Sequence, residues 1–364
     1  MKTNPLRALE ALGQSIWLDY IQRELMTSGQ LKKMIDEDGL GGMTSNPSIF
    51  EQAISKSHDY DADIQMMTQA GHTIDDIYAA LTQKDVQTAA DEFRDLYNKL
   101  DGNDGYVSLE VNPHLSHDTF ATIAQARSLW KALNRPNVLI KVPATKAGIP
   151  AIKQLISEGI NVNVTLLFGL PRYKEVALAY IEGLEMRAAS GAPLKSIASV
   201  ASFFLSRIDV LIDPQLDHAK ELQGQVALSS AKLAYQIYHE LFNSVRFKKL
   251  IEQGARVQRL LWASTSTKNP NYSDVKYVEA IIGPNTVNTL PLETLNAYRD
   301  HGHPKLELEQ DIDKAQAVFK KLSELGIDID KMTQQLEHEG VDKFNKSFDQ
   351  LMSVLKDKSS KDSK

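Results

Sequence analysis

Three ionisable residues, Asp19, Glu110 and Lys141, each lie in the second half of a β-rich apolar run. A lysine near the end of a buried strand is poorly hydrated, and desolvation disfavours its charged form. A neutral lysine amine attacks carbonyl groups, and neighbouring acids can shuttle the protons that imine formation requires. These residues therefore predict Schiff-base chemistry. Two alternatives stay open at this point. The lysine could extend its charged end into solvent at the strand end, or the acids could form a buried ion-pair network that only neutralises the lysine charge.

Small polar residues interrupt other apolar runs, namely Asn46, Asn163, Thr165 and Ser202. Such groups could hydrogen bond the hydroxyls of a polyhydroxylated substrate or an ordered water. An isolated Asn or Thr more often hydrogen bonds to backbone groups at a turn or at the end of a strand, so this second interpretation stays open.

Two cations, Arg207 and Lys268, follow later β-rich runs, where barrel enzymes often bind phosphate. Taken singly, each cation could equally be a solvated surface residue. Arg256 and Arg259 compete with them for a phosphate role, since both lie within one β-rich run.

Apolar β-rich runs alternate with segments of helical periodicity along most of the chain, and no Asn-Gly hairpin turn joins neighbouring runs. This alternation predicts parallel strands with right-handed crossovers. Eight such units favour a (β/α)8 TIM barrel over an open doubly wound sheet, and polar residues at nearly every strand end favour it further. The eight expected strands are centred on Trp17, Met43, Val107, Ile140, Val164, Val200, Leu261 and Ile281.

The chain has no Pro/Gly/Ser linker and no fixed-period repeat, so we expect a single barrel domain over residues 1–355. Extra helices are expected at 5–13 and from residue 311, the latter packing against the barrel near its mouth. The last strand is expected at 277–282, and the Lys/Ser-rich tail 356–364 is expected to be disordered.

Composition excludes several classes of function. The net charge of −6 offers nucleic acid and anionic membranes no broad attraction. With no cysteine, disulfides, thiolate zinc sites and cysteine nucleophiles are excluded. No signal peptide or membrane-spanning run is evident, so a cytoplasmic location is expected. Gly39–Gly42 precedes a strand and fails as a dinucleotide motif, and the histidines form no metal motif, so we expect no cofactor and no metal.

Several blocks, in this order along the chain, resemble the transaldolase family of class I Schiff-base aldolases, and in length the chain resembles the family's longer bacterial subgroup. The Thr-Ser-Asn-Pro-Ser and Ile-Lys-Val-Pro-Ala-Thr stretches are the most specific. The blocks are IWLDYI (16–21), GMTSNPSIF (42–50), VSLEVNP (107–113), VLIKVPAT (138–145), NVNVTLLF (161–168), SVASFFLSRID (199–209) and ASTSTKN (263–269).

The resemblance implies a (β/α)8 barrel in which Lys141 forms the Schiff base and Asp19 is the acid/base for the hydroxyl beside the scissile bond. It implies that Glu110 and Thr165 position the catalytic water. Arg207 falls on the family's phosphate arginine, whereas a second phosphate arginine found in many members corresponds to Lys268 here, a point charge without a bidentate fork. The implied sugar contacts are Thr44, Asn46, Asn163, Ser202 and, lining the pocket, Phe204.

The implied reaction transfers a dihydroxyacetone unit from sedoheptulose 7-phosphate to glyceraldehyde 3-phosphate, giving erythrose 4-phosphate and fructose 6-phosphate. It belongs to the non-oxidative pentose phosphate pathway and needs no cofactor. The expected partners are therefore sugar phosphates, and a monomer and a homodimer both stay open. Two other functions also stay open: an aldolase that releases free dihydroxyacetone, and a non-catalytic sugar-phosphate-binding protein.

Overall fold

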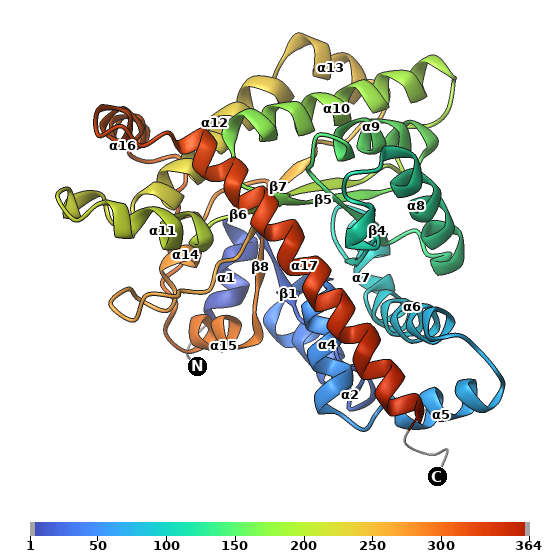
Figure 1. Ribbon diagram of the computed structural model, residues 1–364. Helices are drawn as coiled ribbons and strands as arrows, with labels where there is room; N and C mark the ends of the chain where they lie inside the picture. Colours follow the sequence, from blue (N-terminus) through green and yellow to red (C-terminus); the bar gives the residue numbers. More distant parts are fainter. Residues whose placement is uncertain (1–3, 361–364) are drawn as a thin grey trace.

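Eight parallel strands form a closed barrel in which each strand pairs with its sequence neighbours and β8 closes onto β1 (Figure 1). The computed structural model describes residues 4–360. This architecture confirms the predicted (β/α)8 fold. The strands are β1 (Gln14–Asp19), β2 (Leu40–Thr44), β3 (Tyr106–Glu110), β4 (Val138–Pro143), β5 (Val162–Leu167), β6 (Ser199–Phe204), β7 (Arg259–Ala263) and β8 (Thr286–Leu290).

Helices surround the barrel and fill the connections between its strands. The α-helices before β4 are α1 (Pro5–Ala11), α2 (Arg23–Thr27), α3 (Gln30–Lys33), α4 (Pro47–Lys56), α5 (Asp61–Gln69), α6 (Ile74–Glu92), α7 (Arg94–Lys99) and α8 (Thr119–Leu133). The later helices are α9 (Gly148–Glu158), α10 (Leu170–Ala189), α11 (Ser206–Ile212), α12 (Val226–Phe242), α13 (Val245–Ile251), α14 (Lys276–Glu279), α15 (Leu292–His301), α16 (Ile312–Glu324) and α17 (Ile329–Ser360).

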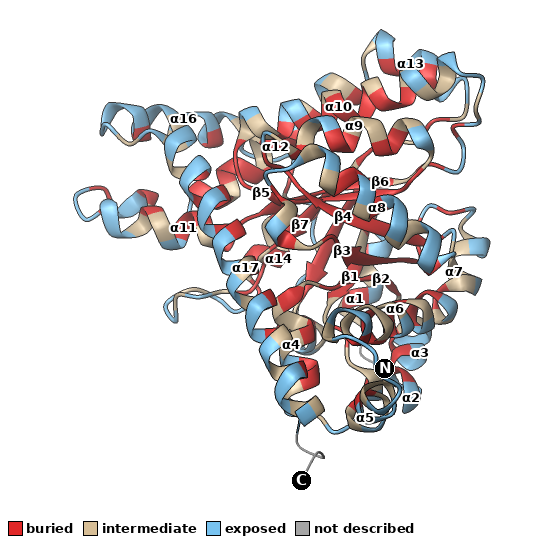
Figure 2. Cartoon of the chain, turned by 45° about the vertical axis from the view of Figure 1, so that its right-hand side comes forward, coloured by how far each residue is buried: buried red, intermediate tan, exposed pale blue. Residues whose placement is uncertain are grey.

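The strands are buried on both faces. In Figure 2 the strands are red, the colour of buried residues, whereas the surrounding helices also carry exposed, pale blue residues. Inward side chains fill the barrel and outward side chains contact the helices, which explains why these strands are nearly continuous apolar runs in the sequence. Among residues 4–360, no helix has the length and apolar character needed to cross a membrane.

Two sequence predictions are wrong. The eighth strand is Thr286–Leu290, whereas the segment 277–282, expected to be the last strand, begins within the helix α14 and forms no strand. A short apolar run fits a buried helical turn as well as a strand, and here Tyr277 and Val278 are buried from a helix. The tail is helical through Ser360, so the expected disorder from Lys356 is wrong for residues 356–360; residues 361–364 lie outside the described part.

Helix α17 crosses the mouth of the barrel as the long red helix of Figure 1, and it contacts α4, α5, α6, α11 and β5. Phe344, Phe348, Leu351 and Leu355 of this helix are buried against the rest of the chain. The expectation that the C-terminal helices pack near the barrel mouth is therefore confirmed for α17.

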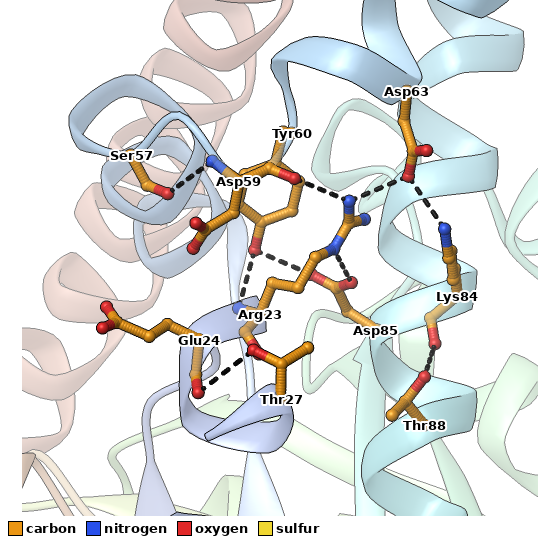
Figure 3. Close-up of polar contacts among 10 residues, drawn as sticks. All are labelled: Arg23, Glu24, Thr27, Ser57, Asp59, Tyr60, Asp63, Lys84, Asp85 and Thr88. Atoms are coloured by element: carbon orange, nitrogen blue, oxygen red, sulfur yellow. Dashed lines mark hydrogen bonds and ion pairs between the residues drawn. The ribbon is translucent and has the colours of Figure 1, made fainter.

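A buried polar network anchors the segment that follows β1 (Figure 3). Arg23 pairs with Asp85 of α6 (Nε to Oδ1, 3.1 Å) and with Asp63 of α5 (Nη1 to Oδ2, 2.8 Å). Tyr60 Oη donates to Asp85 Oδ2 at 2.7 Å, and the Asp85 side chain is only 2% exposed. The network therefore ties the chain just beyond Asp19 to two helices.

Replacing Asp85 with alanine should lower the free energy of unfolding by about 3–5 kcal/mol, because Arg23 and Tyr60 lose a buried partner. Urea unfolding followed by circular dichroism measures the change. The matched control is Asp91→Ala, which removes an exposed pair with Arg135 and should cost about 1 kcal/mol or less. Equal losses in the two variants would contradict a structural role for the network.

Candidate active site

A cavity of about 190 Å³ lies at the carboxyl ends of the barrel strands. Parallel topology brings all strand ends to one side of a barrel, so residues far apart in the sequence meet there. Nine of the eleven residues predicted for the site line this cavity: Asp19, Thr44, Asn46, Lys141, Thr165, Ser202, Phe204, Arg207 and Lys268.

Lys141 lies in β4 beside Glu110 of β3, its partner in the strand register. The lysine is only 4% exposed, and its Nζ lies 3.1 Å from Glu110 Oε2 and donates to the Ser45 carbonyl at 2.8 Å. The solvent-exposed alternative for this lysine is therefore excluded. The amine faces the cavity next to a carboxylate that can exchange a proton with it.

The carboxyl groups of Asp19 and Glu110 occupy the same site, and burial raises the pKa of both while the nearby Lys141 opposes the rise. Thr44 Oγ1 donates to Asp19 Oδ1 at 2.6 Å and thereby orients that carboxyl group. A carboxyl group with a raised pKa holds and releases a proton closer to neutral pH, as a general acid/base must. The site thus places two candidate proton carriers beside one amine.

Thr165 lies at an irregularity of β5. The register between β5 and β6 shifts after Val164, and Leu166 has a left-handed φ of +55°, as in a β-bulge. Thr165 Oγ1 is buried and has no hydrogen-bond partner among the described residues, and the same holds for Glu110 Oε1. Buried polar atoms are nearly always hydrogen bonded, so these two oxygens are available to a water or a substrate group.

Asn163 was predicted to contact the substrate, but the structure does not bring it to the cavity wall. Its Nδ2 donates to Ser108 Oγ at 3.0 Å and its Oδ1 accepts from Ser202 Oγ at 2.6 Å. Asn163 therefore holds Ser202, which does line the cavity. Asn46 combines both of its predicted roles, because it lines the cavity and its Oδ1 caps α4 by accepting from the Ile49 amide at 3.0 Å.

Arg207 and Lys268 reach the cavity from α11 and from the loop after β7. Burial lowers the pKa of Arg207, while Asp19 opposes the change. Helix α11 is itself fixed through Asp209, which accepts from the Ala227 amide at 2.8 Å and from Tyr277 Oη at 2.6 Å. Burial raises the pKa of Asp209 to about 6.

The competing cations Arg256 and Arg259 lie at the other end of the barrel. Arg259 begins β7 and lies 3.5 Å from Asp104, which precedes β3. Arg256 pairs with the Asp101 carboxylate at 3.8 Å. The structure therefore separates these two arginines from the cavity and leaves Arg207 and Lys268 as its predicted cations.

Sequence reasoning missed the cavity residues that come from other segments. Lys343 and Phe344 of α17 line the cavity, and the Phe344 ring centroid lies 5.9 Å from Lys141 Nζ. Ser264, Ser266 and Thr289 complete the wall. The sequence predicted that helices from residue 311 pack near the barrel mouth, but nothing in that prediction pointed to Lys343.

The fold and these side chains define a (β/α)8-barrel enzyme class with a buried lysine and two carboxyl groups at the strand ends. The model of the family described as transaldolase/fructose-6-phosphate aldolase matches residues 16–355. The chain is 48% identical to the transaldolase of Trichodesmium erythraeum and 46% identical to that of Saccharopolyspora erythraea, with 98% of each chain covered in both comparisons. It is 47% identical to the transaldolase of Mycolicibacterium smegmatis over 97% of each chain. The chain belongs to the transaldolase/fructose-6-phosphate aldolase family.

Proposed function

We propose that this protein is a transaldolase, a transferase that moves a dihydroxyacetone unit from sedoheptulose 7-phosphate to glyceraldehyde 3-phosphate and yields erythrose 4-phosphate and fructose 6-phosphate. The observation that supports this most directly is the buried Lys141 amine, 3.1 Å from Glu110 and in one cavity with Asp19. The nearly full-length match to bacterial transaldolases supports the same reaction.

The first step is imine formation at Lys141. Glu110 takes a proton from the ammonium, and the neutral Nζ attacks the C2 carbonyl of the ketose. The resulting carbinolamine loses its hydroxyl as water when Glu110 returns the proton. The buried, unpartnered oxygens of Glu110 and Thr165 are suited to hold that water and to direct it back for hydrolysis of the imine at the end of the cycle.

The second step breaks the C3–C4 bond. Asp19 takes the proton of the C4 hydroxyl, the bond electrons move into the iminium, and an aldose phosphate leaves. The three-carbon unit stays on Lys141 as an enamine. It then attacks the carbonyl carbon of the acceptor aldehyde, and Asp19 gives its proton to the new hydroxyl. Asp19 thereby returns the proton that it took during bond cleavage.

Substrate phosphate is held by Arg207 and Lys268, which lie on one wall of the cavity. Arg207 also lies over the Phe204 ring, with its Cζ 5.5 Å from the centroid. An arginine packed on an aromatic ring keeps a fixed orientation, which suits bidentate hydrogen bonding to two oxygens of a phosphate group.

Borohydride trapping with fructose 6-phosphate tests the proposal. We expect a reduced three-carbon adduct on the peptide that contains Lys141, identified by intact-mass and peptide mass spectrometry. An adduct on another lysine would reject the assigned nucleophile, and a folded protein without any adduct would favour the sugar-phosphate-binding alternative. Omitting the acceptor aldehyde should stall turnover, whereas an aldolase would continue to release dihydroxyacetone.

A further inference from the structure

Three cations from three separate segments converge on the cavity: Arg207 at the start of α11, Lys268 in the loop after β7, and Lys343 in α17. Among residues 4–360, none of the three forms an ion pair with a carboxylate. Lys268 Nζ donates only to the neutral Ser266 Oγ, at 2.6 Å. The cavity therefore contains three cations that no direct ion pair neutralises, although Asp19 and Glu339 act on Arg207 from a longer distance.

Some lysines elsewhere on α17 and in a second cavity do form ion pairs. Lys358, on the same helix as Lys343, lies 2.6 Å from Asp61. A larger cavity of about 840 Å³ between α12 and α16 also contains lysines, yet Lys305 and Lys314 pair there with Glu307 and Asp311. What distinguishes the cluster at the barrel mouth is that its three cations, none of them in an ion pair among residues 4–360, line one cavity with Lys141.

The positive charges of Arg207 and Lys268 disfavour the charged form of Lys343. Arg207 is the main cause that lowers the pKa of Lys343, ahead of burial and of Lys268. Like charges held together in a recess raise the local concentration of anions and gain most from a multivalent one. A phosphate group supplies two charges and several acceptor oxygens, so it can be shared by three donors.

Helix α17 holds Lys343 in place. Before this residue, Glu337 pairs with Arg172 at 3.0 Å, and after it Ser347 Oγ lies 2.6 Å from Ser48 Oγ. Gly340 allows close packing on β5, since a Cβ there would lie 3.0 Å from Leu166 Cδ2. The backbone that carries Lys343 is therefore fixed on both sides of the cavity.

We propose that Lys343 is a third phosphate-binding residue, so that α17 supplies part of the recognition of phosphorylated substrates. This inference rests on the proposed function, because it assigns the lysine to substrate in that same site. Arg207 provides a planar fork, and Lys268 and Lys343 provide two point charges.

The test compares Lys343→Met with Lys346→Met, which removes an exposed lysine one turn away that does not line the cavity. We expect KM for fructose 6-phosphate to rise about 10- to 100-fold in Lys343→Met, because a charge-assisted contact is lost. The Kd for inorganic phosphate, measured by calorimetry, should rise in parallel. Lys346→Met should match the wild type, and Lys343→Arg should restore most of the affinity.

Borohydride trapping with dihydroxyacetone, which carries no phosphate, separates this inference from the proposed function. Lys343→Met should form that adduct as readily as the wild type. If KM and phosphate binding are the same in Lys343→Met and Lys346→Met, the inference is overturned while the transaldolase assignment stands. A wild type that traps neither ketone overturns the assignment, and calorimetry with inorganic phosphate then still decides whether Lys343 binds phosphate.

Discussion

Replacing Lys141 with methionine should reduce transfer activity by at least about 10,000-fold while the protein stays folded. The nucleophile is lost, and no other lysine amine takes its place because Lys268 and Lys343 lie on the phosphate wall. Folding should survive, since methionine fills similar space and burial already raises the pKa of Glu110, which can take up a proton once its partner is gone. A coupled assay for the released aldose phosphate measures the loss.

Two further variants show that the loss reflects the nucleophile. Lys141→Arg keeps a cation beside Glu110 but cannot form an imine, so it should be equally inactive. Lys146→Met removes an exposed lysine five residues along and should retain full activity. Thermal unfolding of all three variants confirms that they are folded. Transfer activity in Lys141→Met near the wild-type rate would end the Schiff-base proposal.

Replacing Asp19 with asparagine should separate imine formation from bond cleavage. The amide oxygen can still accept the hydrogen bond from Thr44, 2.6 Å away in the wild type, so the local structure is kept. Asparagine cannot take the C4 hydroxyl proton, and loss of a general base costs about 100- to 10,000-fold in rate. Borohydride should therefore trap a six-carbon adduct from fructose 6-phosphate, where the wild type gives the three-carbon adduct.

The control for this experiment is Asp36→Asn, which alters an exposed acid paired with Lys32. It should leave both the rate and the three-carbon adduct unchanged. Dihydroxyacetone should still be trapped on Lys141 in Asp19→Asn, since imine formation uses Glu110. A three-carbon adduct formed at the wild-type rate in Asp19→Asn would show that another group is the base.

The sequence predicted the barrel because parallel strands buried on both faces leave a strong signal, an apolar run that ends in a polar residue. That signal failed at 277–282, where buried apolar residues begin in α14, and it missed Thr286–Leu290, where three of the five residues are polar. Asn288 and Thr289 are both buried although they are polar, and this burial depends on tertiary structure that a local pattern does not reveal.

The site was largely predictable for a similar reason. Asp19, Lys141, Thr165 and Ser202 lie in strands, and the closed barrel alone brings the ends of those strands together. Two features depend on contacts that no strand pattern encodes. Asn163 hydrogen bonds to Ser108 and Ser202, and Lys343 reaches the cavity from α17, although it lies more than 70 residues beyond Lys268 in the chain.

The position of α17 after all eight barrel strands also affects when the site is completed. The strands all precede Pro291, whereas Lys343 and Phe344 come from a helix that the ribosome releases after them. Protein chains fold from the amino terminus as they are made, so the barrel can close before α17 emerges. A nascent or prematurely terminated chain can therefore contain Lys141 and both acids yet lack one wall of the cavity.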